Sequence, residues 1–165
     1  MNKDWQKFCQ SFFNYSMTKQ ESIERALALF DEGYACSQSI LMTYAGLFDL
    51  DEDTAKKISS TFGGGMGHLR QKCGALTGSF MVLGLAYGNR DPKDMETKLT
   101  AYRKVRELNQ LIEEIHGSSN CFELISKHAT EAQITERKHH KSICRQVVAD
   151  TAGALFDMLQ KESQF

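Results

Sequence analysis

Four widely spaced cysteines are the residues of this sequence best suited to chemistry: Cys36, Cys73, Cys121 and Cys144. A cysteine thiolate attacks disulfides and binds metal ions, and the free backbone N–H groups at the start of a helix favour the thiolate form. Three of the four fall at predicted helix starts, and Cys144 lies near the start of the last predicted helix. The alternative for each cysteine is that it packs in the core as a small apolar residue.

The spacing of these cysteines excludes the common local motifs. No two of them follow a C-x-x-C pattern, so a thioredoxin-like site and the usual zinc-ribbon and ferredoxin runs are absent. A site that uses all four must therefore be assembled from distant segments of the chain. Helical bundles build sites in this way, from side chains on facing helices.

Several basic residues lie close to these cysteines in the sequence. His68 and His116 each precede one of them by five residues, and His140 and Lys141 precede Cys144 by four and three. An imidazole can bind a metal ion or carry a proton, and a cation one helical turn away stabilises a thiolate. A solvated basic helix face explains His140 and Lys141 equally well.

A fifth cysteine, Cys9, lies in a helix predicted over 4–15. Phe8 and Phe12 share its apolar face, so a packed or partly exposed thiol explains Cys9 more simply than a role in the site. We therefore leave Cys9 out of the site and interpret residues 1–16 as a packing arm.

The elements that must position the cysteines are marked by helix caps and glycines. Thr18 and Glu21 form a capping-box pattern that predicts a helix start, and Gly33 is expected to end that helix. The glycine-rich run 62–67 is expected to interrupt regular structure with a tight turn that brings the backbone near Cys73, because glycine destabilises helices and permits positive φ. Further helices are predicted from Asp51 to Ser60, over 74–87, and from Asp91 and Pro92 to Gly117.

The composition predicts an all-α protein. The sequence of 165 residues has one proline, 41% hydrophobic and 25% charged residues, and helical periodicity recurs along it while strand-like alternation is scarce. We therefore expect a single-domain helical bundle of about six to eight helices over residues 1–165. The cysteine motif region spans 33–155.

Charge and hydropathy exclude two classes of partner. The net charge of −1, without a nucleic-acid motif, argues against binding to nucleic acid. The most apolar stretch, 74–88, is shorter than the roughly 20 residues of a membrane-spanning helix, so no membrane is expected. The start of the chain, over 1–15, lacks the apolar core of a secretory signal, which predicts a soluble, cytoplasmic protein with reduced thiols.

The arrangement of these elements resembles a known family over roughly residues 33–155. The matching elements, in order, are Tyr34-Ala35-Cys36-Ser37-Gln38, Phe62-Gly63-Gly64-Gly65-Met66-Gly67, Cys73-Gly74-Ala75-Leu76-Thr77-Gly78, Leu83-Gly84-Leu85, Cys121 and Cys144. They resemble the redox-active proteins named for the cysteine pattern C_GCAxxG_C_C. One departure is that the pattern places glycine before its second cysteine, whereas this chain reads Cys73-Gly74-Ala75.

The resemblance implies a redox or metal-binding role for Cys36, Cys73, Cys121 and Cys144. The first interpretation is thiol–disulfide or electron-transfer chemistry, as in an oxidoreductase, with an unidentified redox partner. The second is a four-cysteine metal centre, either an iron–sulfur cluster or structural zinc. The third is a non-catalytic helical interaction protein, whose long helix over 92–117 offers a partner surface. A homo-oligomer and a cysteine hydrolase remain open, the latter without a visible base.

Overall fold

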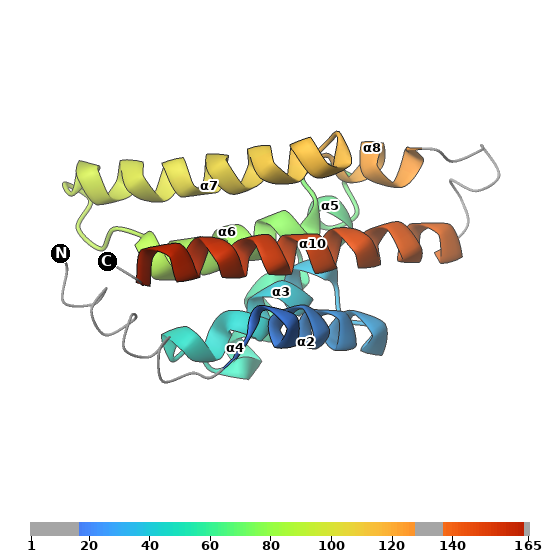
Figure 1. Cartoon of the computed structure of the whole chain (residues 1–165), viewed down its shortest axis with the longest axis horizontal. Helices are drawn as coiled ribbons and strands as arrows, with labels where there is room; N and C mark the ends of the chain where they lie inside the picture. The colour runs from blue at the N-terminus through green and yellow to red at the C-terminus, as the bar shows by residue number, and fades with distance from the viewer. Residues whose placement is uncertain (1–16, 128–136, 164–165) are drawn as a thin grey trace.

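The computed structural model describes residues 17–127 and 137–163, which form an all-α bundle (Figure 1). This confirms the predicted fold class, with seven α-helices in the described residues besides a one-turn glycine segment and a short 3₁₀ helix. The predicted packing arm 1–16 and Cys9 lie outside the described residues. The elements are α2 (Lys19–Glu32), α3 (Cys36–Tyr44), η1 (Ala45–Phe48), α4 (Glu52–Ser60), α5 (Gly63–Met66), α6 (Gly74–Tyr87), α7 (Met95–His116), α8 (Cys121–Ser126) and α10 (Arg137–Ser163).

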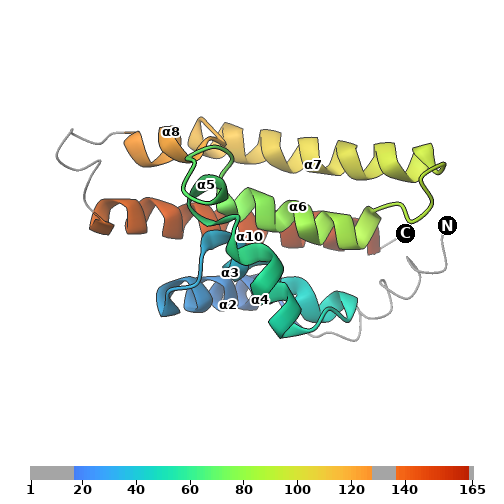
Figure 2. The same ribbon diagram turned by 180° about the vertical axis from the view of Figure 1, so that it is seen from behind.

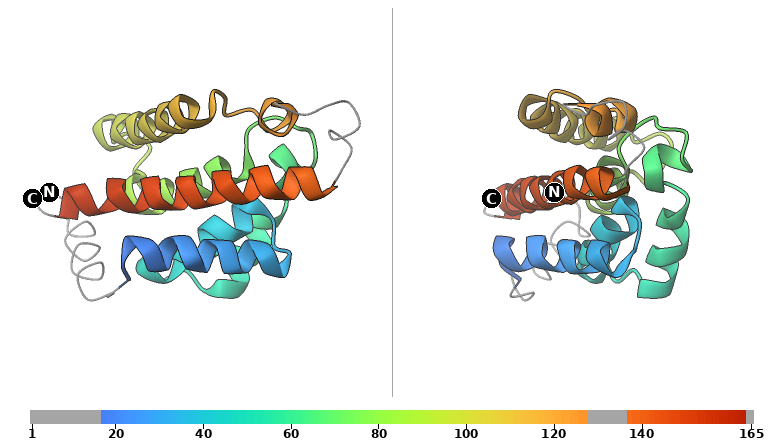
Figure 3. Two further views of the ribbon diagram at one scale, coloured as in Figure 1. Left: turned by 45° about the vertical axis from the view of Figure 1, so that its right-hand side comes forward. Right: turned by 90° about the vertical axis from the view of Figure 1, so that its right-hand side faces the viewer.

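The helices are arranged in layers around α6 and α10. Helix α3 packs on α6, and α2 packs on both α3 and α10, while α7 lies against the other side of α6 and α10. Figure 2 shows α6 between α7 and α4, and the end-on view in Figure 3 shows α10 between α7 and α2. Helix α10 therefore contacts α2, the first described helix, as well as helices from the middle and the later part of the chain.

The core is formed by apolar side chains of α3, α6, α7 and α10. One polar group in it is the Tyr44 hydroxyl, which donates a hydrogen bond of 2.7 Å to the carbonyl of Ala152 and so is not left unsatisfied in the interior. Each fully buried aliphatic side chain contributes roughly 1.5–3 kcal/mol to folding. The largest such side chains are Ile40, Leu41, Leu76, Leu83, Leu108, Ile112, Leu155 and Leu159.

Most of the predicted helix caps are confirmed. Thr18 and Glu21 make the reciprocal capping box, Gly33 ends α2 with φ +112°, and Asp51 accepts from the Thr54 N–H at 2.9 Å at the start of α4. These ends could be predicted because a cap depends on residues that are neighbours in the sequence.

The predicted start of α7 at Asp91 and Pro92 is wrong. The Asp91 carboxylate accepts from the Lys93 N–H and its carbonyl accepts from the Asp94 N–H, so this segment is a turn. Asp94 is the N-cap instead, because its carboxylate accepts from both the backbone N–H and the hydroxyl of Thr97.

Helix α10 also begins earlier than expected. It starts at Arg137, so Cys144 lies about two turns inside it and not near its start. In the parts of the chain that the structure describes, no helix combines the length and the hydropathy needed to cross a membrane.

Candidate redox site at the cysteines

Three of the four predicted cysteines lie at the starts of helices that contact α10, and the fourth, Cys144, lies in α10 itself. Cys36 is the first residue of α3, Cys73 is the N-cap of α6, and Cys121 is the first residue of α8. The α5 turn packs against α3, α6 and α8, at the end of the bundle where α10 passes (Figures 1 and 2). The charges of the other three sulfurs all act on the Cys36 thiol, so the fold brings the four cysteines together.

Cys36 and Cys144 form a hydrogen-bonded pair of thiols, and both residues are half-buried. Donating this bond to Cys144 raises the pKa of Cys36 well above its ordinary value, and burial raises that pKa further. Accepting the bond lowers the pKa of Cys144, and the nearby positive charge of Arg70 lowers it further, against the opposing effect of burial. Of the two, Cys144 is thus the thiol that ionises more readily, and Cys36 is the one that keeps its proton.

Cys73 and Cys121 are held by a short antiparallel pairing that joins Lys72 to Asn120. The Cys73 N–H donates to the Ser119 carbonyl at 2.9 Å, and the Cys121 N–H donates to the carbonyl of Gln71 at 2.6 Å. In such a pairing, residues 73 and 121 are diagonal neighbours, with Cβ atoms about 7 Å apart, whereas a disulfide needs about 3.5–4.5 Å. The pairing therefore brings these two cysteines close without favouring a bond between them.

Both of these cysteines are buried. Burial raises the pKa of Cys73 to about 12, although the Ala75 and Leu76 N–H groups at the start of α6 act in the opposite direction. Burial also raises the pKa of Cys121, and a hydrogen bond from Arg70 partly offsets it. Both residues thus favour the protonated thiol.

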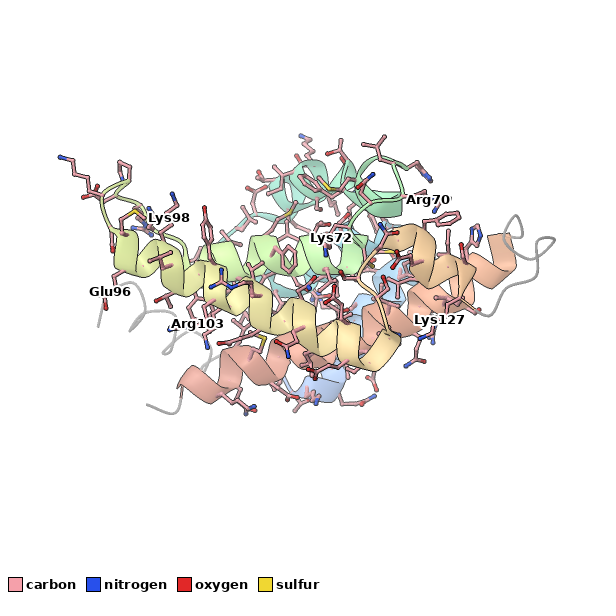
Figure 4. All side chains as sticks on the ribbon, turned by 90° about the horizontal axis from the view of Figure 1, so that it is seen from above. Arg70, Lys72, Glu96, Lys98, Arg103 and Lys127 are labelled. Atoms are coloured by element: carbon pink, nitrogen blue, oxygen red, sulfur yellow. The ribbon has the colours of Figure 1, made fainter. Side chains whose placement is uncertain are left out.

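A polar network connects this pairing to α7. The Lys72 ammonium group donates to Asn109 Oδ1 at 2.9 Å and to Ser119 Oγ at 2.5 Å, and the Ser119 hydroxyl donates to Glu113 Oε1. Figure 4 shows Lys72 between the α6 start and α7. Sequence analysis did not identify this network, because its members come from three separate segments and follow no local pattern.

The glycine-rich turn interrupts regular structure, as predicted, and it packs against the starts of both α6 and α8. The Phe62 carbonyl oxygen lies 3.2 Å from the position of a Cβ atom at Gly74, the residue after Cys73. Gly65 has φ +74°, and a Cβ atom there would lie 2.6 Å from the Cys121 Cβ. Gly64 and Gly67 also have positive φ, a conformation that glycine adopts without strain. The turn therefore requires glycine at position 65 for two reasons, backbone conformation and space.

Arg70 is a site residue that sequence reasoning missed. Its Nη1 donates to Cys121 Sγ at 3.8 Å, and its charge acts on Cys144 as well. The residue has a left-handed backbone, with φ +59°, which non-glycine residues adopt rarely. Nothing local in the sequence distinguishes this arginine, because only the fold brings it to the sulfurs.

The basic residues proposed from the sequence have other contacts. The His68 ring lies against Gly64, and His116 Nε2 lies 3.1 Å from Asp150 Oδ2. Lys141 Nζ lies 4.0 Å from Asp31 Oδ1 across the bundle. The sequence suggested a cation one turn away in the same helix. The cation that lowers the pKa of Cys144 is instead Arg70, from a distant segment.

The four thiols suit a metal centre by their chemistry, but their arrangement in the described residues does not. Four thiols are suitable ligands for zinc or an iron–sulfur cluster. Among the described residues, however, no group of three or more His, Cys, Asp or Glu side chains is arranged to hold a metal ion. The described side chains, as they are arranged, therefore do not fit a metal centre.

Comparison with known protein families identifies a related family. A family model described as "Putative redox-active protein (C_GCAxxG_C_C)" matches residues 34–158, most of the chain. No curated protein and no solved structure matches.

Proposed function

Since the chain belongs to the C_GCAxxG_C_C family of redox-active proteins, we propose that it exchanges thiols for disulfides through Cys36 and Cys144. The observation that carries this proposal is the hydrogen bond between these two half-buried thiols. A disulfide between them requires loss of one proton from the pair and transfer of two electrons to an oxidant, which in the proposed reaction is the substrate disulfide.

The proposed reaction begins at the Cys144 thiolate, the nucleophilic form of a cysteine. The thiolate attacks one sulfur of a substrate disulfide, a bond forms between the two sulfurs, and the other half of the substrate leaves as a thiolate that takes up a proton. The Cys36 thiol then loses its proton and attacks the Cys144 sulfur, which closes the Cys36–Cys144 disulfide and releases the second substrate thiol. Two electrons pass from the protein dithiol to the substrate disulfide, and an external dithiol regenerates the reduced pair.

The order of these steps follows from the coupling of the two thiols. While Cys144 is a thiolate, its charge and its accepted hydrogen bond keep the Cys36 pKa high, so Cys36 retains its proton. Once Cys144 is in a mixed disulfide, it carries no charge and both of these effects end. The Cys36 pKa then falls, which makes Cys36 a competent nucleophile at the second step and not before.

Trapping with an aromatic disulfide probe, dithiobis(nitrobenzoate), tests this order. We expect Cys36→Ser to react and retain the mixed disulfide on Cys144, identified by peptide mass mapping, because the resolving thiol is missing. Cys144→Ser should release the aromatic thiol much more slowly. Cys9→Ser, a cysteine outside the family pattern, is the matched control and should behave as wild type. A wild-type disulfide mapped to any other pair of cysteines would contradict the proposal.

A further inference from the structure

We infer that Arg70 is the positioning residue of this site: its guanidinium holds the Cys121 thiol and favours the thiolate of Cys144. This inference rests on the proposed thiol–disulfide function and adds the residue that sets the charge state of its nucleophile. Figure 4 shows Arg70 near the end of the α7–α8 layer, where the loop before α6 passes the start of α8.

The backbone of Arg70 is anchored on both sides by hydrogen bonds. The Arg70 N–H donates to the Gly64 carbonyl at 3.4 Å, and the Arg70 carbonyl accepts from the Phe122 N–H at 3.3 Å. These two bonds join the α5 turn to the first turn of α8, on either side of a left-handed residue. The backbone of the arginine is thus anchored next to Cys121, and its Nη1 lies 3.8 Å from Cys121 Sγ.

The charged groups around Cys144 leave this role to Arg70. Two cations of its own helix, Lys141 and Arg145, are paired with a carboxylate instead, because both contact Asp31 of α2, at 4.0 and 3.1 Å. The positive charge of Arg70 is the one that lowers the pKa of Cys144, second to the Cys36 hydrogen bond. The titratable or charged groups around the sulfur come from several elements. They are Cys36 from α3, Arg70 from the loop before α6, Cys73 at the start of α6, Cys121 from α8, and His140, Lys141 and Arg145 on α10.

A cation is needed there for an electrostatic reason. Burial disfavours the thiolate of Cys144, and the other sulfurs add no positive charge to balance it. By contacting Cys121 on one side and acting on Cys144 on the other, one guanidinium serves two sulfurs from different helices. Arginine suits this position because its planar group presents several donors and stays charged at all accessible pH values.

The test is the pH profile of alkylation at Cys144. Iodoacetamide reacts with the thiolate, which forms a carbon–sulfur bond and releases iodide, so the rate follows the thiolate fraction. The rate at Cys144 is read by peptide mass mapping of the reduced full-length protein. We expect Arg70→Gln and Arg70→Met to move the midpoint upward by about one pH unit or more, and Arg70→Lys to restore most of the shift. Glutamine, methionine and lysine have the same backbone cost as arginine in a left-handed conformation, so the variants differ from wild type only in the side chain.

Arg103→Gln is the matched control, because Arg103 is an exposed arginine of α7 that lies 3.9 Å from Glu107. Its profile should match wild type. An unchanged midpoint in both neutral Arg70 variants would overturn the inference, and so would an equal shift in Arg103→Gln or a failure of lysine to rescue. Alkylation needs no disulfide substrate. If the shift appears while the aromatic disulfide fails to react, the proposed function fails and the role of Arg70 stands.

Discussion

The thiol of Cys36 at the start of α3 donates a hydrogen bond to Cys144, two turns inside α10. These residues lie in distant parts of the sequence, and only the packing of α3 and α10 brings them together. The bond couples their protonation, so the state of either sulfur sets the reactivity of the other. The first prediction follows from this coupling.

Removing the donor should raise the pKa of Cys144. Cys36→Ala leaves the Cys144 thiolate without its principal hydrogen bond, so we expect a midpoint higher by about one pH unit in the ultraviolet absorbance of the thiolate. Cys36→Ser keeps a hydroxyl donor and should fall between alanine and wild type. Equal midpoints for alanine and wild type would show that the hydrogen bond does not stabilise the thiolate.

Stability should fall at alkaline pH, in part because of Cys73. Its pKa is raised to about 12 in the native protein, whereas an unfolded cysteine has a pKa of about 8.5. The native state therefore binds more protons between these values, and its stability is fully present below about pH 8.5. For this one thiol the free energy of unfolding should fall by up to about 1.4 kcal/mol per pH unit above that. Urea unfolding of the reduced protein measures the slope.

Cys73→Ala is the control for that titration. The variant lacks this thiol while Cys36 and Cys121, whose pKa values are also raised, remain. Its unfolding free energy should therefore decline less steeply with pH than that of the wild type. Parallel slopes would mean that Cys73 titrates normally in the folded protein.

Two glycines of α6 should respond in opposite ways to the same substitution. A Cβ atom at Gly78 would lie 2.6 Å from the Ser37 carbonyl oxygen, so Gly78→Ala should separate α3 from α6 and cost about 1–3 kcal/mol. Nothing lies within 4 Å of a Cβ atom at Gly84, so Gly84→Ala should stabilise the helix by up to about 1 kcal/mol. Chemical denaturation compares the two, and destabilisation by both would refute the packing argument.

Cys73 and Gly74 stand in the reverse of the order that the family pattern gives, and a double variant can restore that order. A Cβ atom at Gly74 would lie 3.2 Å from the Cys36 Cβ, slightly closer than the about 3.5–4.5 Å of a disulfide. The double variant Cys73→Gly/Gly74→Cys should therefore form a bond between residues 36 and 74 on mild oxidation. Peptide mapping checks this, with the single variant Cys73→Gly as control. A Cys36–Cys144 bond alone in the double variant would contradict the expectation.

The arrangement of the thiols also predicts the metal content. We expect protein purified without oxygen to hold iron and zinc far below one atom per chain, since the described residues offer no ready group of ligands. Elemental analysis measures this, and a variant with all four cysteines replaced by serine is the control. Near-stoichiometric metal in the wild type, absent from that variant, would replace the exchange mechanism with a four-cysteine centre.

Local interactions determined what could be predicted from the sequence. The capping box at Thr18, the glycine end of α2 at Gly33 and the helix starts at Cys36 and Cys73 all depend on residues within one or two turns. The cap of α7 is an exception: the sequence predicts it at Asp91, whereas the hydrogen bonds of the structure place it at Asp94, because both aspartates precede the same helical pattern.

The sequence by itself determined the class of the fold, most of the helices and the four dispersed thiols that are candidates for the site. The tertiary structure decided that Cys144 faces Cys36, that an antiparallel pairing holds Cys73 and Cys121, and that Arg70 supplies the positive charge. The physical reason is range. Helix propensity and capping act over a few residues, whereas the charge state of a buried thiol depends on whatever distant segment the packing places beside it.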